Sequence, residues 1–196
     1  FIEIEKFNPS SLIEIHNRPL YLKQLTEKLN RKFVFHYHND PLTMNGSRLP
    51  KERIFMINNC EKIIFCSNWV KKRFLKNINE NYINDDKFLI INHSINKKKI
   101  NFNKKKKIIT FVGRLNSAKG YDIFGKAIIK ILDKHKDWHA HVAGDEPREK
   151  LEFNHDRLIK HGFLNHDQIL KLYELSSIAV TCSRWEEPFG RTSLEA

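Results

Sequence analysis

The sequence has few of the residues that build disulfide scaffolds and membrane spans. Its 196 residues contain only three cysteines, Cys60, Cys66 and Cys182, and no two of them form a Cys-x-x-Cys pair. This excludes a disulfide framework, argues against a cysteine-based zinc site and indicates a reducing compartment. No apolar run approaches the roughly 20 residues that a membrane-spanning helix needs, and no basic and apolar leader opens the chain. We expect a cytoplasmic protein.

Acidic residues are in the minority. The chain has 35 Lys and Arg residues against 23 Asp and Glu residues, which gives a formal net charge of +12. Such an excess favours an anionic partner, either nucleic acid, a phosphate-rich ligand or an acidic membrane surface. Seven of the positive charges are lysines within residues 97–107, a stretch that suits a solvated linker able to touch anionic lipid. No RNA-recognition aromatic motif, zinc finger or basic helix accompanies the charge, so we expect no specific nucleic-acid partner.

Short runs rich in Ile, Val and Phe alternate with stretches of helical spacing. Runs of this kind are typical of buried parallel strands, and their alternation with helices predicts βαβ units in a doubly wound α/β architecture. Glycine usage also shifts along the chain, since only Gly46 precedes the lysine run and six glycines follow it. We therefore expect two Rossmann-like segments, residues 1–97 and 107–196, joined by a basic linker at 98–106. The predicted strands lie at 11–15, 32–38, 62–67, 88–92, 108–113, 138–144 and 178–182, and the predicted helices at 19–30, 50–58, 67–77, 119–135 and 166–176.

A basic loop follows the first strand of the second segment. Gly113 and Arg114 come directly after the strand, and Lys119 precedes a predicted helix. Backbone N–H groups and the helix dipole favour an anion at such a helix start. Arg114 can offer a planar fork to a phosphate and Lys119 a mobile point charge, which together suit a diphosphate. The loop matches neither Gly-x-Gly-x-x-Gly nor a Walker motif, so solvated basic residues remain the alternative interpretation.

Two glutamates bracket the last predicted helix. Pro188 suits the first turn of a helix, and a helix that begins there places Glu195 about seven residues, or ~10 Å, along its axis. This length resembles the span from the sugar to the ribose of a nucleotide diphosphate sugar. Glu187 could then accept hydrogen bonds from sugar hydroxyls and Glu195 from the ribose diol, while amides near Gly190 meet the phosphates. The alternative is a surface turn at Glu187 and a solvated helix face at Glu195.

Ordered motifs in the second segment resemble a known family. The motifs are Val112-Gly113-Arg114-Leu115 with Lys119-Gly120, Val142-Ala143-Gly144, His161-Gly162-Phe163-Leu164 and Glu187-Pro188-Phe189-Gly190 to Glu195-Ala196. They resemble the donor domain of retaining GT-B glycosyltransferases with a Glu-x7-Glu motif, the glycosyltransferase family four type or glycosyl transferases group 1. The resemblance implies that Arg114 and Lys119 bind the donor diphosphate, Glu187 the sugar and Glu195 the ribose. It extends the donor site to Gly113, Phe189, Gly190, Arg191 and Thr192.

The first segment is similar to the later part of the acceptor domain of the same family. The similarity lies in 13–19, 35–41 and 65–70, and His38 matches a histidine that faces the donor sugar in that family. His16, Arg18 and Asp40 are acceptor-side candidates. The usual glycine-rich opening loop and the closing helices are missing. We therefore expect a fragment of a GT-B enzyme, in which two incomplete Rossmann-like domains face a cleft.

The resemblance also implies a reaction. A hexosyl group would pass from a UDP-, GDP- or ADP-sugar to a glycan or lipid-linked acceptor with retention of configuration, as in the synthesis of cell-envelope polysaccharide or lipopolysaccharide. It implies no cofactor and no catalytic metal. Arg114 and Lys119 would stabilise the leaving diphosphate, while Glu187 and His38 would contact the sugar near the reacting carbon.

Two other functions stay open at this point. His36 and His38 alternate on a predicted strand and so share one face, where a His-x-His pair can open a metal site. With His93 as the best-placed further ligand, a metal-dependent hydrolase is a rival hypothesis. A sugar-nucleotide-binding protein without catalytic activity is the other, because it would share every donor motif.

Overall fold

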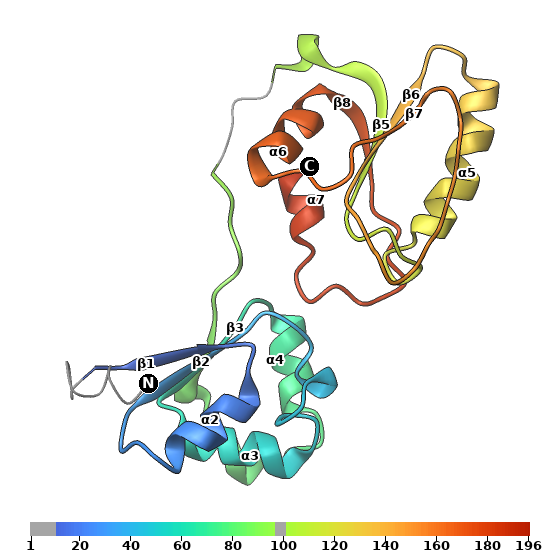
Figure 1. Ribbon diagram of the computed structural model, residues 1–196. Coiled ribbons are helices and arrows are strands. Elements are labelled where there is room, and N and C mark those ends of the chain that lie inside the picture. Colours follow the sequence, from blue (N-terminus) through green and yellow to red (C-terminus); the bar gives the residue numbers. More distant parts are fainter. Residues whose placement is uncertain (1–10, 97–100) are drawn as a thin grey trace. The chain divides into compact units, whose positions relative to one another are not determined.

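The computed structural model describes residues 11–96 and 101–196 (Figure 1). The chain divides into two compact units, Phe1–His93 and Ser94–Ala196. Each unit is built on a four-stranded sheet in which every neighbouring pair of strands is parallel. The predicted α/β class with Rossmann-like segments is thereby confirmed.

The first unit is a βαβ series in which the strands follow their order in the chain, β1-β2-β3-β4. Because all three crossovers run in the same direction, right-handed connections place the three helices on one face of the sheet (Figure 1). Its strands are β1 (Ile13–His16), β2 (Phe33–Tyr37), β3 (Lys62–Phe65) and β4 (Phe88–Ile90), and its helices are α2 (Pro19–Thr26), α3 (Pro50–Asn59) and α4 (Asn68–Leu75). Short 3-10 turns lie at Pro41–Thr43, Glu80–Tyr82 and Asp85–Lys87.

Alternation along β2 decides what each face of the first sheet carries. Phe33, Phe35 and Tyr37 are fully buried among the helices. The Tyr37 ring lies 5.9 Å from Phe65 and 5.4 Å from Phe74, measured between ring centroids. Side chains of a strand alternate between its two faces, so His36 belongs to the opposite face. The apolar core is therefore what directs this histidine away from the helices.

A buried arginine joins the loops of the first unit. Arg53 on α3 is 1% exposed. Its Nη1 donates to the carbonyl oxygens of Ser47 at 2.9 Å and Arg48 at 2.6 Å, and its Nη2 donates to the carbonyl of Lys76 at 2.5 Å. One guanidinium thus links the start of α3 to the end of α4. These carbonyls depend on Arg53 because an unsatisfied buried polar group costs about 1–3 kcal/mol.

The second unit has the strand order β7-β6-β5-β8. The chain moves outward from β5 to β6 and β7, then returns through α6 to pair β8 with the free side of β5. Its strands are β5 (Lys106–Val112), β6 (His139–Ala143), β7 (Leu158–Lys160) and β8 (Ser176–Val180), and its helices are α5 (Tyr121–Lys134), α6 (His166–Leu175) and α7 (Arg191–Glu195). The sequence analysis missed β7 because only Leu158 of its three residues is buried, so no apolar run marks it.

Helix α5 covers the second sheet with a narrow apolar stripe. Phe124, Ile128 and Leu132 repeat every four residues and are all at least 96% buried, at 4%, 1% and 0% exposure. They pack on Phe111 of β5 and Val142 of β6. None of the described helices is long and apolar enough to cross a bilayer.

The last helix begins later than predicted. The sequence places its start at Pro188, but α7 begins at Arg191 with Gly190 as its N-cap. Gly190 has a φ of 81°, in the left-handed region, and a right-handed helix cannot continue through such a residue. Residues 187–190 are therefore a loop, and the predicted axial spacing from Pro188 to Glu195 is wrong.

The lysine run is partly engaged with the second unit. Residues 97–100 of this run, and with them part of the predicted linker, lie outside the described residues. Beyond them, Lys105 Nζ donates to the Tyr173 carbonyl at 2.8 Å, Lys104 Nζ lies 3.6 Å from a Glu174 oxygen, and Lys107 pairs with Asp137. These three lysines thus contact groups within the second unit.

We predict that Arg53→Met destabilises the first unit by about 3 kcal/mol, because three backbone carbonyls lose the donor that the buried guanidinium supplies while the apolar packing is largely retained. The measurement is urea unfolding followed by Trp69 fluorescence, with Trp138 and Trp185 replaced by Phe in every protein compared. Lys51→Met, on the exposed side of the same helix, is the control and should stay within about 0.5 kcal/mol of the parent. Equal stability of the two variants would contradict the role given to Arg53.

Candidate functional site

The second sheet opens a pocket where its strand order reverses. Since β6 and β8 flank β5 on opposite sides, the chain leaves the carboxyl ends of β5 and β8 in different directions. In open α/β sheets this reversal is where ligands bind. A pocket of about 370 Å³ lies there, formed by the two strand ends and the loop before α7. Among the residues lining it are Lys119, Ser183, Trp185, Glu187, Phe189, Gly190 and Thr192.

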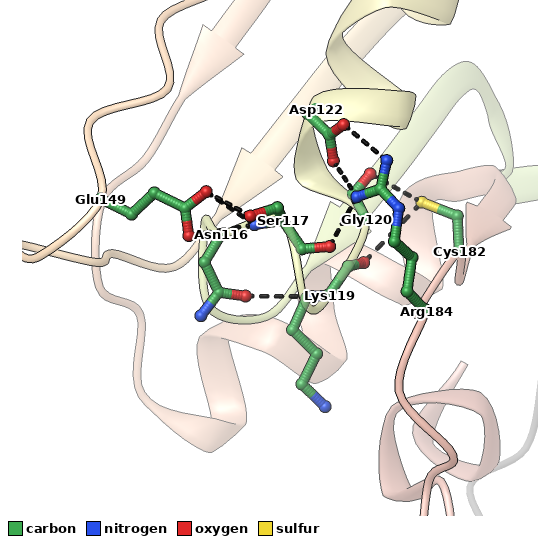
Figure 2. A network of polar contacts seen from close by, with 8 residues as sticks. All are labelled: Asn116, Ser117, Lys119, Gly120, Asp122, Glu149, Cys182 and Arg184. Atoms are coloured by element: carbon green, nitrogen blue, oxygen red, sulfur yellow. Dashed lines mark hydrogen bonds and ion pairs between the residues drawn. The ribbon is translucent and has the colours of Figure 1, made fainter.

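The loop between β5 and α5 is a tight turn fixed by its own polar groups (Figure 2). Asn116 Oδ1 accepts the Lys119 amide at 3.0 Å, and the Ser117 carbonyl accepts the Gly120 amide at 3.0 Å. Gly120 has a φ of 74°, and a Cβ added there would lie 2.0 Å from the carbonyl oxygen of Cys182. Only glycine meets both demands, so this residue lets the loop lie against the segment after β8.

Arg184 ties that segment to the same loop. Its amide donates to the Ala118 carbonyl at 3.0 Å, and its Nη1 donates to the Ser117 carbonyl at 2.7 Å. The guanidinium also grips the Asp122 carboxylate with two nitrogens, as Figure 2 shows. The hydrogen bond from Arg184 lowers the pKa of Asp122 to about 2. The first turn of α5 and the end of β8 are therefore locked together.

A carboxylate already occupies one anion-binding amide of the loop. The Ser117 amide lies 3.2 Å from each Glu149 oxygen, and the Ser117 hydroxyl donates to the same carboxylate. Together with the engaged amides of Lys119 and Gly120, this leaves little of the helix start for a ligand. The sequence predicts that these amides receive phosphate. In the structure, the positive charge that the loop directs into the pocket belongs to the Lys119 side chain.

Lys119 and Glu187 form an ion pair in the pocket. The Lys119 ammonium contacts Glu187 Oε1, which also accepts the Ser183 hydroxyl at 2.6 Å. Burial by itself raises the pKa of the Glu187 carboxyl, but the hydrogen bonds from Lys119 and Ser183 outweigh it and lower the pKa. The carboxylate is therefore held ionised beside a cation. The Glu187 oxygens can accept hydrogen bonds from hydroxyl groups, and the neighbouring Lys119 ammonium can donate hydrogen bonds to an anion.

Gly113 and Arg114 lie in a neighbouring hollow. This hollow measures about 190 Å³, and among its lining residues are Gly144, Asp145 and Phe163. A Cβ on Gly144 would lie 1.8 Å from the Gly113 carbonyl oxygen, so glycine at position 144 allows β5 and β6 to end in contact. The sequence analysis grouped Arg114 with Lys119 in one diphosphate grip. The structure places them in two hollows that share Val112.

The predicted donor residues at 189–195, on α7 and just before it, divide between the pocket and its outside. Phe189, Gly190 and Thr192 line the pocket, whereas Arg191 and Glu195 are not among its described lining residues. Arg191 Nη2 lies 3.0 Å from Glu195 Oε1, and His166 Nδ1 lies 3.7 Å from the same oxygen. The Glu195 side chain is 10% exposed. Its carboxylate is therefore anchored between α7 and α6.

His38 of the first unit stands at the end of β2 among other histidines. Its amide donates to Asn17 Oδ1 at 2.8 Å, its Nε2 lies 3.0 Å from His16 Nδ1, and its Nδ1 lies 3.3 Å from His93 Nε2. Burial, followed by the charges of His93, His16 and His36, lowers the pKa of His38 to about 4. The ring is therefore neutral at pH 7 and can act through hydrogen bonds rather than through charge.

Two other acceptor-side candidates have different surroundings. Asp40 is 5% exposed, and its oxygens accept Arg73 Nη2 at 2.7 Å and the Leu42 amide at 3.0 Å. It acts as the N-cap of a 3-10 turn and holds α4 against that turn. Arg18 is exposed and donates to the Asn17 carbonyl at 3.2 Å. Arg18 is thus accessible, whereas the Asp40 carboxylate is already used within the unit.

The residues of the site that the sequence did not predict are Ser183, Arg184, Asp122 and Glu149, which hold the β5 loop and the ion pair. A weak signal existed for the first two, since they follow β8 and loops after adjacent parallel strands meet at one sheet edge. No local pattern marks Glu149, which reaches Ser117 from the irregular segment between β6 and β7.

We predict that Lys119→Met raises the pKa of Glu187. Burial raises this pKa, and the variant loses the Lys119 ammonium that counteracts burial in the parent. Carboxyl NMR titration measures this shift. In the parent, the pair stabilises the fold above the ordinary Glu pKa, and this stabilisation is lost as the pH falls through the lowered folded value. In Lys119→Met this acid-dependent loss should be smaller. Lys126→Met, exposed on α5, should leave the Glu187 titration unchanged, and the same titration curve in both variants would disprove the coupling.

Related proteins share this fold and parts of this sequence. The chain is 33% identical over 134 residues to an uncharacterized glycosyltransferase of Methanocaldococcus jannaschii, with 57% of this chain and 34% of that protein covered. It is 33% identical over 110 residues to the lipopolysaccharide core biosynthesis mannosyltransferase LpsB of Rhizobium meliloti, with 51% and 31% covered. The chain thus spans about a third of the length of the curated relatives it matches.

Solved structures agree in fold at low sequence identity. The crystal structure of HepE from Anabaena in complex with UDP matches 100% of this chain and 58% of its own, with a TM-score of 0.74 and 16% identity. The lipopolysaccharide outer core galactosyltransferase WaaB matches 99% of this chain and 56% of its own, with a TM-score of 0.64 and 13% identity. These neighbours have the GT-B fold. The family model of glycosyl transferases group 1 matches residues 92–196, more than half of the sequence. The matched residues include the second unit with its pocket at the strand-order reversal. The chain therefore belongs to the glycosyl transferases group 1 family.

Proposed function

We propose that the full-length protein transfers a hexose, with retention of configuration, from a UDP-, GDP- or ADP-sugar to a glycan or lipid-linked acceptor. The observation that carries this proposal is the Lys119–Glu187 pair in the pocket between β5 and β8. In this pair, the Lys119 ammonium binds the diphosphate of the donor, and the neighbouring Glu187 carboxylate accepts hydrogen bonds from the sugar hydroxyls. Family membership and the nucleotide-bound structure of HepE support the same donor class.

The ion pair is compatible with diphosphate binding. An ammonium group has three donors, so Lys119 can keep one on Glu187 and direct another to a phosphate oxygen. As the sugar leaves, negative charge grows on the diphosphate, and a fixed cation in a partly buried pocket stabilises that charge most in the transition state. Arg114 supports the leaving group from the neighbouring hollow. The proposal gives transfer no metal and no cofactor, because these side chains supply the charge.

The remaining assignments rest on the resemblance to the family. Glu195 receives the ribose diol, Phe189, Gly190 and Thr192 border the donor, and Arg191 orients Glu195 through their ion pair. His38, neutral at pH 7, orients the sugar by a hydrogen bond. We place the enzyme in the cytoplasm, where the lysine run at 97–107 also touches anionic lipid. The acceptor belongs to cell-envelope polysaccharide or lipopolysaccharide synthesis, in line with the relatives LpsB and WaaB.

We predict that Glu195→Ala weakens binding of a nucleoside diphosphate about 10- to 100-fold, the value of one or two charge-assisted hydrogen bonds. Isothermal titration of the full-length protein with UDP, GDP and ADP measures this loss. Glu174→Ala, an exposed carboxylate on α6, is the matched control and should bind as the parent does. Unchanged affinity in Glu195→Ala would remove the ribose contact from the proposal.

The transfer itself is tested by nucleotide release from a panel of sugar nucleotides, with NMR of the product to read its anomeric configuration. We expect Lys119→Met to lower turnover about 10²- to 10³-fold, the usual cost of removing one transition-state charge stabiliser. Excess EDTA should not lower turnover. Tight nucleotide binding without turnover by the full-length protein would favour the alternative, a sugar-nucleotide-binding protein. An inverted product would refute retention.

A further inference from the structure

Three histidines of the first unit bring their ring nitrogens together on one sheet edge. His16, His36 and His38 each offer a nitrogen, and these atoms lie within 4.8 Å of one another. We call these three residues the histidine cluster. Within residues 11–96 and 101–196, it is the one group of three or more potential metal ligands with this spacing. It lies apart in the chain from the donor pocket, which belongs entirely to the second unit.

The parallel sheet itself builds the cluster. His16 at the end of β1 is in register with His36 on β2, and their rings stack with centroids 4.3 Å apart. His38 follows two residues later and therefore belongs to the same face. Its backbone is fixed by the hydrogen bond from its amide to Asn17 Oδ1 at 2.8 Å. Two members of the cluster, His16 and His36, thus lie on paired strands, and His38 follows directly after β2.

The distances suit a tetrahedral cation. Zinc binds imidazole nitrogen at about 2.0–2.1 Å, so two nitrogens on one tetrahedral ion lie about 3.3 Å apart. His16 Nδ1 and His38 Nε2 are 3.0 Å apart. One ring nitrogen of His36 lies within 4.8 Å of both of these atoms. Three protein nitrogens leave the fourth position of a tetrahedral ion open to water or another small ligand.

The outer nitrogens also face groups that could orient the rings. Glu14 Oε2 lies 3.6 Å from His16 Nε2 and 3.7 Å from His36 Nε2. His38 Nδ1 lies 3.3 Å from His93 Nε2. Metal-bound histidines commonly donate their second ring N–H to a carboxylate or another acceptor, which fixes the tautomer. Here that pattern leaves His16 Nδ1, His36 Nδ1 and His38 Nε2 for the cation.

A second observation concerns the nitrogen of His36 that faces Glu14. His36 Nε2 is buried, and it has no hydrogen-bond partner among the described residues. The nearby Glu14 carboxylate, at 3.7 Å, is beyond ordinary hydrogen-bond reach. A cation on the other nitrogen makes this N–H more acidic and strengthens its attraction to Glu14. Binding would therefore improve a contact that is incomplete in the protein alone.

We propose that the histidine cluster binds one divalent transition-metal cation of the zinc class, through His16, His36 and His38. Imidazole donors select Zn²⁺, Co²⁺ or Ni²⁺ over Mg²⁺ and Ca²⁺, which prefer oxygen ligands. The site goes beyond the proposed transfer, which uses no metal. Nucleotide need not be present for the cation to bind, so cation binding is measured in the absence of nucleotide, separately from sugar transfer.

The test is Zn²⁺ titration of the 196-residue chain at neutral pH in competition with a chromophoric chelator. We expect one equivalent to bind, with affinity reduced at least tenfold in His16→Ala and in His36→Ala. Glu14→Gln, which keeps all three nitrogens, should weaken binding about tenfold. Co²⁺ should give the intense visible absorption of a tetrahedral site, and Mg²⁺ should not displace Zn²⁺.

The matched control is a histidine pair in the second unit. His141 Nδ1 and His161 Nε2 are 2.9 Å apart, as close as the nitrogens of the cluster, but they belong to no group of three described ligands. His141→Ala should bind Zn²⁺ as the parent does. Far-UV circular dichroism checks that each variant is folded. If a folded His16→Ala and a folded His36→Ala both retain full affinity, or if the parent binds no Zn²⁺, the proposal is wrong.

Discussion

Pairing of β5 on both of its sides is the constraint on which the second unit depends. β6 and β8 are both parallel to β5, so the carboxyl ends of all three strands meet at one sheet edge. The order of the strands reverses there, and the chain cannot fill the space between the departing loops. The pocket is a consequence of this topology. Its chemistry is then supplied by whichever side chains follow the two strand ends.

Residues of the protein itself hold the walls of the pocket in place, without help from a ligand. Arg184 joins the β5 loop, the first turn of α5 and the segment after β8, and Glu149 satisfies the Ser117 amide. Such fixed surroundings keep Lys119 and Glu187 in place before a substrate arrives. Preorganised charge stabilises a transition state without a cost of rearrangement during the reaction. The ion pair is also mutually stabilising, which keeps both charged groups in a partly buried site.

The first unit uses the same edge of its sheet for different chemistry. Its strands run in chain order without a reversal, and the described strand ends gather imidazoles instead of opposite charges. His38 stands at the centre of this arrangement, within hydrogen-bond distance of both His16 and His93. A cation bound through its Nε2 would take the lone pair that a sugar hydroxyl could otherwise use. The proposed metal site and the proposed sugar contact therefore compete for one atom.

The sequence by itself determined the α/β class, most strands and helices, and the family, because hydrophobic periodicity and ordered motifs are local properties of the chain. It could not show β7, whose three residues carry no apolar run, or the start of α7, which the left-handed Gly190 delays. Only the tertiary structure decided that Lys119 meets Glu187, that Arg114 lies in a separate hollow, and that Asp40 is used by Arg73. Asp40 and Arg73 are 33 residues apart in the sequence, and Lys119 and Glu187 are 68 residues apart. Contacts over such separations follow from strand order and crossover direction, which no local pattern encodes.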